Sequence, residues 1–246
     1  MNRRQIFLTA AWLWATILGA QNKVTTVGFQ IKPIITAPLF GTGPQEISNL
    51  NSGMVVNVVQ NTGYTAGMSI RKGFEKNFSL EFGINFCRRN LNISTDFQNS
   101  PSNNRLRIIG YELPLAGLFF VRLSERVYMN VGTGFCMNIF PSDVINPGEP
   151  LYVYAGRRIS FNPGLLAQTG IEYRSVRSGY FYLGASFNRP FFPIYELAVD
   201  YTQNQTVISS IVAPMRGTYL TADLRYYFHE SPERKKAKLP SEKKGK

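Results

Sequence analysis

The sequence predicts an all-β fold, an eight-stranded antiparallel up-and-down transmembrane β-barrel, and three observations lead to it. Short polar breaks recur about fifty residues apart, at residues 75–77, 124–126 and 175–179. Apolar and polar residues alternate on both sides of each break, as they do in β-strands, whose successive side chains point to opposite faces. An apparent secretory signal comes before all of these segments.

The alternation is clearest after the second break. Thr133 is the only polar residue on one face, whose other members are Val127, Met129, Val131, Phe135, Met137 and Ile139. The opposite face is small or polar. Alternation alone does not exclude a soluble sandwich, in which the polar face meets water. Export and the absence of a long apolar run after the signal favour a membrane barrel, because a chain without such a run can span a bilayer only with strands.

Residues 1–20 read as the signal peptide. Arg3 and Arg4 precede the apolar run 6–18, and Ala20 offers a cleavage position before Gln21. The run is short for a membrane helix. We therefore expect residues 21–228 to form the barrel and residues 229–246 to form a tail.

Eight alternating segments follow the signal, an even number as expected for a bacterial barrel. We place the strands at residues 25–35, 64–74, 78–93, 106–121, 127–140, 158–174, 180–191 and 218–228. The short breaks are then periplasmic turns, with both termini on that side. The long connections at 36–63, 94–105, 141–157 and 192–217 are then extracellular loops. Within them, residues 54–59 and 208–212 look strand-forming, either as extended hairpins or as partner-binding segments.

Charged residues alternate with the apolar face and are therefore expected to point into the barrel. They are Lys32, Arg71, Glu81, Arg89, Glu112, Arg158, Glu172, Arg174, Asp223 and Arg225. Eight strands leave an interior that side chains just fill, and unpaired buried charges are costly. We expect a plug of salt bridges, the alternative being a proton or ion path through Glu112, Glu172 or Asp223. A general diffusion pore is disfavoured.

The sequence offers little for catalysis, and we expect no enzyme, cofactor or metal site. The only histidine is His229, just after the last strand, whereas a serine nucleophile needs a base. Four loop carboxylates could act as acid and base without any spacing that selects them. These are Asp143, Glu149, Glu196 and Asp200.

Cys87 and Cys136 both face the predicted lumen in an oxidising compartment, which raises the question of a disulfide. They lie two strands apart, and adjacent strands are roughly 4.8 Å apart. The α-carbons should therefore sit near or beyond the roughly 7 Å limit for a bridge. We expect two buried free thiols.

Aromatic residues are frequent at outward positions near strand ends, as in the interfacial girdles of membrane barrels, the alternative being a carbohydrate-binding platform. Tyr226 and Phe228 in the last strand resemble the barrel insertion signal. In the outer loops, the candidate partner contacts are Tyr152, Tyr154, Tyr195 and Tyr201.

The formal net charge is +12, and seven basic and three acidic residues give +4 to residues 229–246. A segment this polar is predicted to be a disordered periplasmic tail. Its bases suit an anionic periplasmic partner, or it is simply solvated; nucleic acid is excluded by compartment. The candidate contacts there are Arg234, Lys235, Lys236 and Lys238.

Residues 107–115, Arg-Ile-Ile-Gly-Tyr-Glu-Leu-Pro-Leu, resemble a strand motif of the PorT-like outer-membrane β-barrel superfamily of Bacteroidetes. Residues 67–74 and 82–86 are similar to the second hairpin of that group, and the resemblance covers residues 24–228. It implies a multi-pass barrel of the eight-stranded OmpA type in the outer membrane of a Gram-negative bacterium. Some members are accessory barrels of type IX secretion and gliding machinery, and others are small surface proteins.

The expected function is that of a non-enzymatic accessory or scaffolding subunit of a larger envelope assembly. The alternative is a standalone surface protein that binds a ligand, glycan or partner protein through its loops. In both cases outer-membrane lipid surrounds the barrel. The accessory role also requires a protein partner in the envelope.

Overall fold

The computed structural model describes residues 25–37, 41–49, 53–75, 77–176, 178–204 and 206–228. The predicted signal at 1–20 lies outside these residues, as does the predicted tail with His229, Arg234, Lys235, Lys236 and Lys238. In the described part no helix is long and apolar enough to span a membrane.

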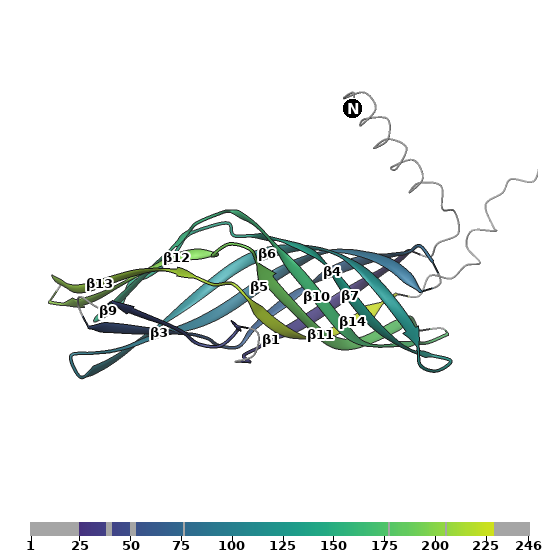
Figure 1. Ribbon diagram of the computed structural model, residues 1–246, viewed down its shortest axis with the longest axis horizontal. Coiled ribbons are helices and arrows are strands. Elements are labelled where there is room, and N and C mark those ends of the chain that lie inside the picture. The colour runs from purple at the N-terminus through teal and green to yellow at the C-terminus, as the bar shows by residue number, and fades with distance from the viewer. Residues whose placement is uncertain are drawn as a thin grey trace, which may run out of the picture.

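Eight antiparallel strands close into a ring, as predicted (Figure 1). The ring order is β1, β4, β5, β6, β7, β10, β11 and β14, and β14 pairs back onto β1. The strands are β1 (Thr25–Ile35), β4 (Gly63–Gly73), β5 (Phe78–Phe97), β6 (Ser100–Arg122), β7 (Val127–Ile139), β10 (Phe161–Arg174), β11 (Tyr180–Pro190) and β14 (Tyr219–Tyr227).

Six further strands lie in the segments that we predicted as loops. They are β2 (Gln45–Asn49), β3 (Met54–Gln60), β8 (Val144–Asn146), β9 (Leu151–Arg157), β12 (Tyr195–Gln203) and β13 (Thr206–Met215). β2 and β3 extend the barrel sheet beside β5, while β13, β12, β9 and β8 form a second sheet. Residues 54–59 and 208–212 lie in strands, as the extended-hairpin interpretation predicted, and partner binding by these segments stays a prediction. We call these six strands, with the far halves of β5 and β6, the hairpin sandwich.

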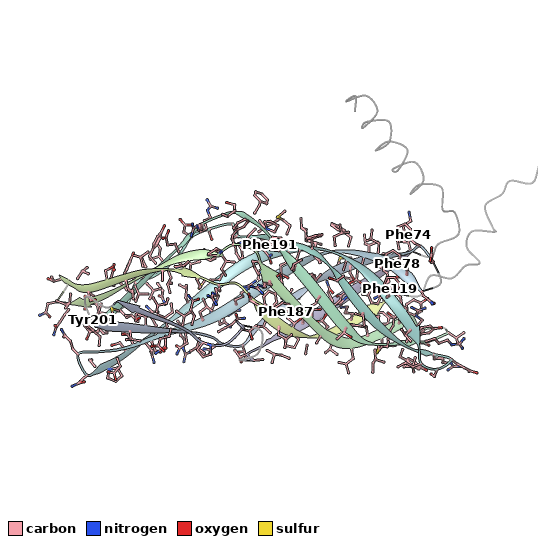
Figure 2. The ribbon with its side chains drawn as sticks, viewed as in Figure 1. Phe74, Phe78, Phe119, Phe187, Phe191 and Tyr201 are labelled. Atoms are coloured by element: carbon pink, nitrogen blue, oxygen red, sulfur yellow. The ribbon has the colours of Figure 1, made fainter. Side chains whose placement is uncertain are left out.

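β5 and β6 run through both parts of the molecule (Figure 1). They extend to Phe97 and back from Ser100, farther than the predicted ends at residues 93 and 106. Figure 2 shows Phe74, Phe78 and Phe119 at the short-turn end, whereas Tyr201 lies near the opposite, hairpin end.

The polarity of β5 inverts along its length without any shift in the alternation. Between Phe78 and Phe86 the apolar side chains point outward, and Glu81 and Asn85 point into the barrel. Beyond Arg89, Leu91 and Ile93 are buried inside, and asparagines and serine face outward. The first half therefore suits a lipid surrounding outside and a polar lumen, and the second half suits water outside and an apolar core.

The hairpin sandwich has its own apolar core, to which both sheets contribute. Its buried members include Met54 and Val56 of β3, Ile93 of β5, and Val153 and Leu197 of the second sheet. This core stabilises the packing of the two sheets, because burying an aliphatic side chain contributes roughly 1.5–3 kcal/mol. The long connections are therefore structured and not irregular.

Side-chain amides join the two sheets of the hairpin sandwich at both edges. Beside β6, the Nδ2 of Asn104 donates to the carbonyl of Leu151 at 2.9 Å, and the Nδ2 of Asn146 donates to the carbonyl of Arg105 at 2.6 Å. Beside β2, the Nε2 of Gln45 donates to the carbonyl of Pro214 at 2.8 Å. These bonds satisfy backbone groups at edges where no strand is paired.

Truncation of Tyr195 tests the sandwich core. Its ring packs on Phe140 at 5.4 Å between centroids, and its hydroxyl donates to the carbonyl of Ser142 at 2.9 Å. We expect Tyr195→Ala to cost about 3–5 kcal/mol, as for other buried aromatic truncations. Limited proteolysis should then cut within β8 to β13 faster than in the native protein. Tyr152→Ala, on the outer face of the same sheet, should leave the cleavage rate unchanged; equal rates for the two variants would contradict this account.

Candidate functional site

The barrel lumen gathers most of the charged residues that alternation assigned to it. Those that are buried are Lys32, Arg71, Glu81, Arg89, Glu112, Glu172, Asp223 and Arg225. They comprise four basic and four acidic side chains, so the buried charges balance. Their arrangement decides whether the lumen could conduct protons or ions, or whether its side chains only fill the interior.

Glu81 lies at the centre of the group nearest the short turns. Its carboxylate accepts from the Nη2 of Arg71 at 3.2 Å and from the Nη1 of Arg225 at 2.6 Å. The hydroxyl of Tyr227 donates to the same carboxylate at 2.5 Å. Arg71 also pairs with Glu172 and stacks on the Tyr227 ring, with its Cζ 4.0 Å from the centroid. Each of these charges therefore has partners of opposite sign.

Asp223 continues the same network across the lumen. Arg225 donates to Asp223 and to the amide oxygen of Gln168, and the ammonium of Lys32 lies 3.7 Å from the Asp223 carboxylate. The hydroxyls of Ser186 and Thr221 also donate to Asp223. This carboxylate is fully buried and held from several strands at once.

A second group lies farther toward the hairpin sandwich. The Nη2 of Arg89 lies 3.7 Å from the Glu112 carboxylate, and its Nη1 donates to the carbonyl of Gly217 at 2.7 Å. The hydroxyl of Tyr219 donates to Glu112 and accepts from Asn188 at 3.2 Å. Glu112 therefore has a cationic and a hydroxyl partner.

Aromatic and glycine residues fill space between the charged groups. A Cβ on Gly184 would lie 2.3 Å from the hydroxyl oxygen of Tyr182, and one on Gly170 would lie 2.6 Å from its Cζ. Only glycine therefore accommodates this ring, over which Arg225 lies with its Cζ 4.7 Å from the centroid. The observed lumen matches the expected salt-bridge plug in its arrangement; its transport behaviour stays a prediction.

Two lumen predictions need correction or refinement. Arg158 is exposed, because β10 begins only at Phe161 and the alternation does not extend back through the bend at residues 158–160. Arg174 is half-buried at the rim, where its Nε donates to Glu172 at 2.6 Å and its Cζ lies 4.0 Å from the Tyr128 ring centroid. The assignment of Arg158 to the lumen was wrong.

Two of the four tyrosines proposed as partner contacts are not available for contact. Tyr195 is 0% exposed and Tyr201 is 6% exposed, because both point into the sandwich core. Tyr152 and Tyr154 lie on the outer face of β9 and are half-buried. The missed signal was the alternation of residues 195–201 and 151–155, in which apolar residues occupy every second position.

The remaining predicted positions lie where expected on the barrel. Cys87 and Cys136 are buried and unbridged, which confirms the prediction of free thiols. Tyr226 and Phe228 lie on the outer wall, where the Phe228 ring packs on Phe29 at 5.6 Å. Their role as an insertion signal stays a prediction. Among the described residues no cluster of three His, Cys, Asp or Glu side chains could hold a metal.

The outer face of the second sheet carries an apolar stripe across all four of its strands. Cross-strand pairing aligns Ile145 with Tyr154, Tyr154 with Ala198, and Ala198 with Val212. Ile145 and Val212 at its ends are 55% and 58% exposed. We call these four residues the sheet stripe.

Carboxylates flank the sheet stripe. Glu196 and Asp200 stand on either side of Ala198 along β12, on the same face. Asp143 accepts from the Tyr154 hydroxyl at 3.1 Å and from the backbone N–H of Arg157 at 2.8 Å. The surface thus combines an apolar line with acidic edges.

Comparison with known proteins gives a likeness in fold. No protein-family model matches the chain, and no curated protein sequence matches it. Crystal-structure matches include the outer membrane protein OprG of Pseudomonas aeruginosa (TM-score 0.50, 10% identity, 85% of this chain and 96% of that chain). Neisserial surface protein A is similar at TM-score 0.44 and 12% identity, over 85% of this chain and 100% of that chain. The NMR structure of the outer membrane protein AlkL matches at TM-score 0.42 and 14% identity, over 85% and 90%.

Neutralising Glu81 tests the lumen network. Glu81→Gln leaves Arg71 and Arg225 buried with fewer counter-charges, and breaking a buried pair in this way costs about 3–5 kcal/mol. Urea unfolding in detergent micelles should show that loss. Glu125→Gln, in an exposed turn, is the matched control and should behave like the native protein. A Glu81→Gln barrel as stable as the control would contradict the network.

The pKa of Asp143 provides a pH test outside the barrel wall. The backbone N–H of Arg157 lowers the pKa of this carboxyl, and the Tyr154 hydroxyl and the Arg157 charge lower it further. A lowered folded-state pKa stabilises the fold above the unfolded-state value, and that stabilisation is lost as the pH falls through the folded value. The protection factor of the Arg157 amide, which compares its exchange rate with the intrinsic rate at each pH, should therefore fall under acid conditions, and Asp143→Asn should abolish that fall. An unchanged pH dependence in that variant would exclude Asp143 as its source.

Proposed function

We propose that this chain is a non-enzymatic outer-membrane β-barrel that docks a partner protein through its hairpin sandwich, as an accessory subunit of a larger envelope assembly. The observation that carries the proposal is the sheet stripe, an apolar line on the outer face of the second sheet. Isolated apolar residues are ordinary on a surface, but a contiguous line rimmed by polar residues is typical of an interaction site.

Placement in the outer membrane is supported by the apolar outer wall and by the outer-membrane origin of OprG. Short connections at one end and long ones at the other favour periplasmic turns and an extracellular sandwich. Both chain ends of the barrel then face the periplasm. The resemblance to the PorT-like group of Bacteroidetes supports a role in an assembly such as secretion or gliding machinery.

A passive role is supported by the lumen. Its charges are paired from wall to wall, and Tyr182 and the Gln168 side chain occupy the space between them. Opening a path would require breaking several buried ion pairs at once, each costing several kcal/mol. Function is therefore proposed for the surfaces of the protein and not for its interior.

The chemistry of the sheet stripe indicates the kind of partner. Glu196 and Asp200 leave an acidic margin beside Val212 and Ala198. A complementary surface would carry an apolar ridge flanked by Lys or Arg, because opposite charges at a rim guide association and register. The basic tail at 229–246 could serve a separate anionic periplasmic partner, as its sequence predicts.

The test is a pair of surface variants in the native membrane. Tyr154→Ser with Val212→Ser removes an inner residue and one end of the sheet stripe, while Asn92→Ala with Ser94→Ala changes the outer face of β5 in the other sheet. After gentle solubilisation, native gels should show the barrel in a larger complex. The stripe variant should shift to the monomer position, and the control should remain in the complex.

Two outcomes would count against the proposal. A native protein recovered only as a monomer would remove the accessory-subunit role and favour a standalone surface protein that binds through the same face. A complex that survives loss of the stripe would place the partner elsewhere on the barrel.

A further inference from the structure

Three arginines lie together on the outer wall, just beyond the apolar belt. Arg88 belongs to β5, and Arg105 and Arg107 belong to β6. Pairing places Arg88 opposite Ile109 and Arg107 opposite Asn90, so Arg88 and Arg107 are diagonal neighbours. Diagonal neighbours in a sheet are about 7–8 Å apart, within reach of long side chains. Arg105 follows two residues away on the same face.

No carboxylate compensates these charges among the described residues, although almost every cation in the lumen is paired. The ion pairs of the described chain do not include Arg88, Arg105 or Arg107. The Nε of Arg88 is buried and has no hydrogen-bond partner there. Clustered, uncompensated guanidinium groups favour an anion, and their planar donors match phosphate especially well.

The position of the cluster restricts the source of that anion. On the barrel side, the cluster is bordered by the aromatic rings of Tyr64, Phe86 and Tyr111. The Phe86 ring centroid lies 6.1 Å from that of Tyr64 and 6.0 Å from that of Tyr111. Tyr64 pairs directly with Arg88 in the sheet. Outward aromatic rings mark the lipid–water interface of membrane barrels. The arginines therefore stand at the level of lipid headgroups, on the side of the hairpin sandwich.

A groove of about 760 Å³ accompanies the arginines and suits a sugar as well as a phosphate. Its lining includes Asn61, Thr62, Asn90 and Asn146, besides the three arginines. Amide and hydroxyl groups can donate to and accept from sugar hydroxyls. No acidic residue lines this groove.

We propose that this groove, the arginine groove, binds the phosphorylated sugar headgroup of an outer-leaflet glycolipid whose acyl chains lie against the apolar wall below it. Arg88, Arg105 and Arg107 contact the phosphate. Asn61 and the amide oxygens of Asn90 and Asn146 contact sugar hydroxyls, since the amide nitrogens of Asn90 and Asn146 already donate to the carbonyls of Thr62 and Arg105. The site differs from the sheet stripe in its charge and its ligand, although Ile145 borders both surfaces. It rests on the proposed extracellular placement of the hairpin sandwich and not on a protein partner.

Binding of bisphosphorylated lipid A to the purified full-length protein in detergent micelles tests the site by native mass spectrometry. We expect Arg88→Gln/Arg105→Gln/Arg107→Gln to weaken binding by roughly tenfold or more, since charged hydrogen bonds are lost. The matched control Arg158→Gln/Arg189→Gln/Arg216→Gln removes the same charge at other exposed arginines and should keep the native affinity. Folding of each variant is judged by its gel mobility without heating. If the triple variant does not fold, Arg107→Gln alone is measured in its place and should lose part of the binding.

Ligand variants identify what the groove recognises. Dephosphorylated lipid A should bind the native protein weakly. Its affinity should match that of bisphosphorylated lipid A for the triple variant. Equal binding of the two lipids, or equal losses in the triple variant and its control, would overturn the proposal. Equal binding of an acyl-free glucosamine bisphosphate would show a soluble phosphate site and would overturn its assignment to a membrane lipid.

Discussion

Every backbone N–H and C=O group of the membrane-crossing strands needs a partner within the protein, because lipid offers none. Closure of the ring, with β14 paired back onto β1, meets this constraint for the whole wall. A closed ring has only two faces, and the period of two assigns each residue to one of them. The lumen then receives every polar side chain that the lipid-facing wall cannot carry, and these side chains stabilise the fold only if they pair there.

The same alternation continues past the lipid and serves the opposite purpose. In β5, the inward positions change from Glu81 and Asn85 to Leu91 and Ile93 while the register of the strand stays the same. The hairpin sandwich is consequently a water-exposed structure with an apolar interior, built on strands that the barrel already holds in place. With the lumen filled by side chains, we propose that function lies on the outer surfaces, where the sheet stripe and the arginine groove present different chemistry.

Much of this architecture could be predicted from the alternation, and its failures have physical causes. The first barrel strand was predicted at the observed ends, since apolar outward residues such as Phe29 and Ile31 contrast with inward polar ones. The ends of β5 and β6, at residues 94–97 and 100–105, were missed because outward residues there are polar, such as Ser94 and Asn103, and resemble a loop in sequence. Parity could assign side chains to the lumen but not name their partners, because ion pairs such as Arg71 with Glu172 join strands distant in the chain.

Accessibility along β5 tests most directly the claim that polarity inverts while the alternation continues. Spin labels at single cysteines, introduced after Cys87 and Cys136 are changed to serine, would be measured in lipid bilayers with oxygen and with a water-soluble relaxation agent. Labels at Phe82, Ile84 and Phe86 should respond to oxygen, and labels at Asn92 and Ser94 should respond to the water-soluble agent. Labels at the intervening inward positions should be shielded from both. Lipid-like exposure at Asn92 and Ser94, or a change in the phase of the alternation between Phe86 and Asn92, would contradict the account.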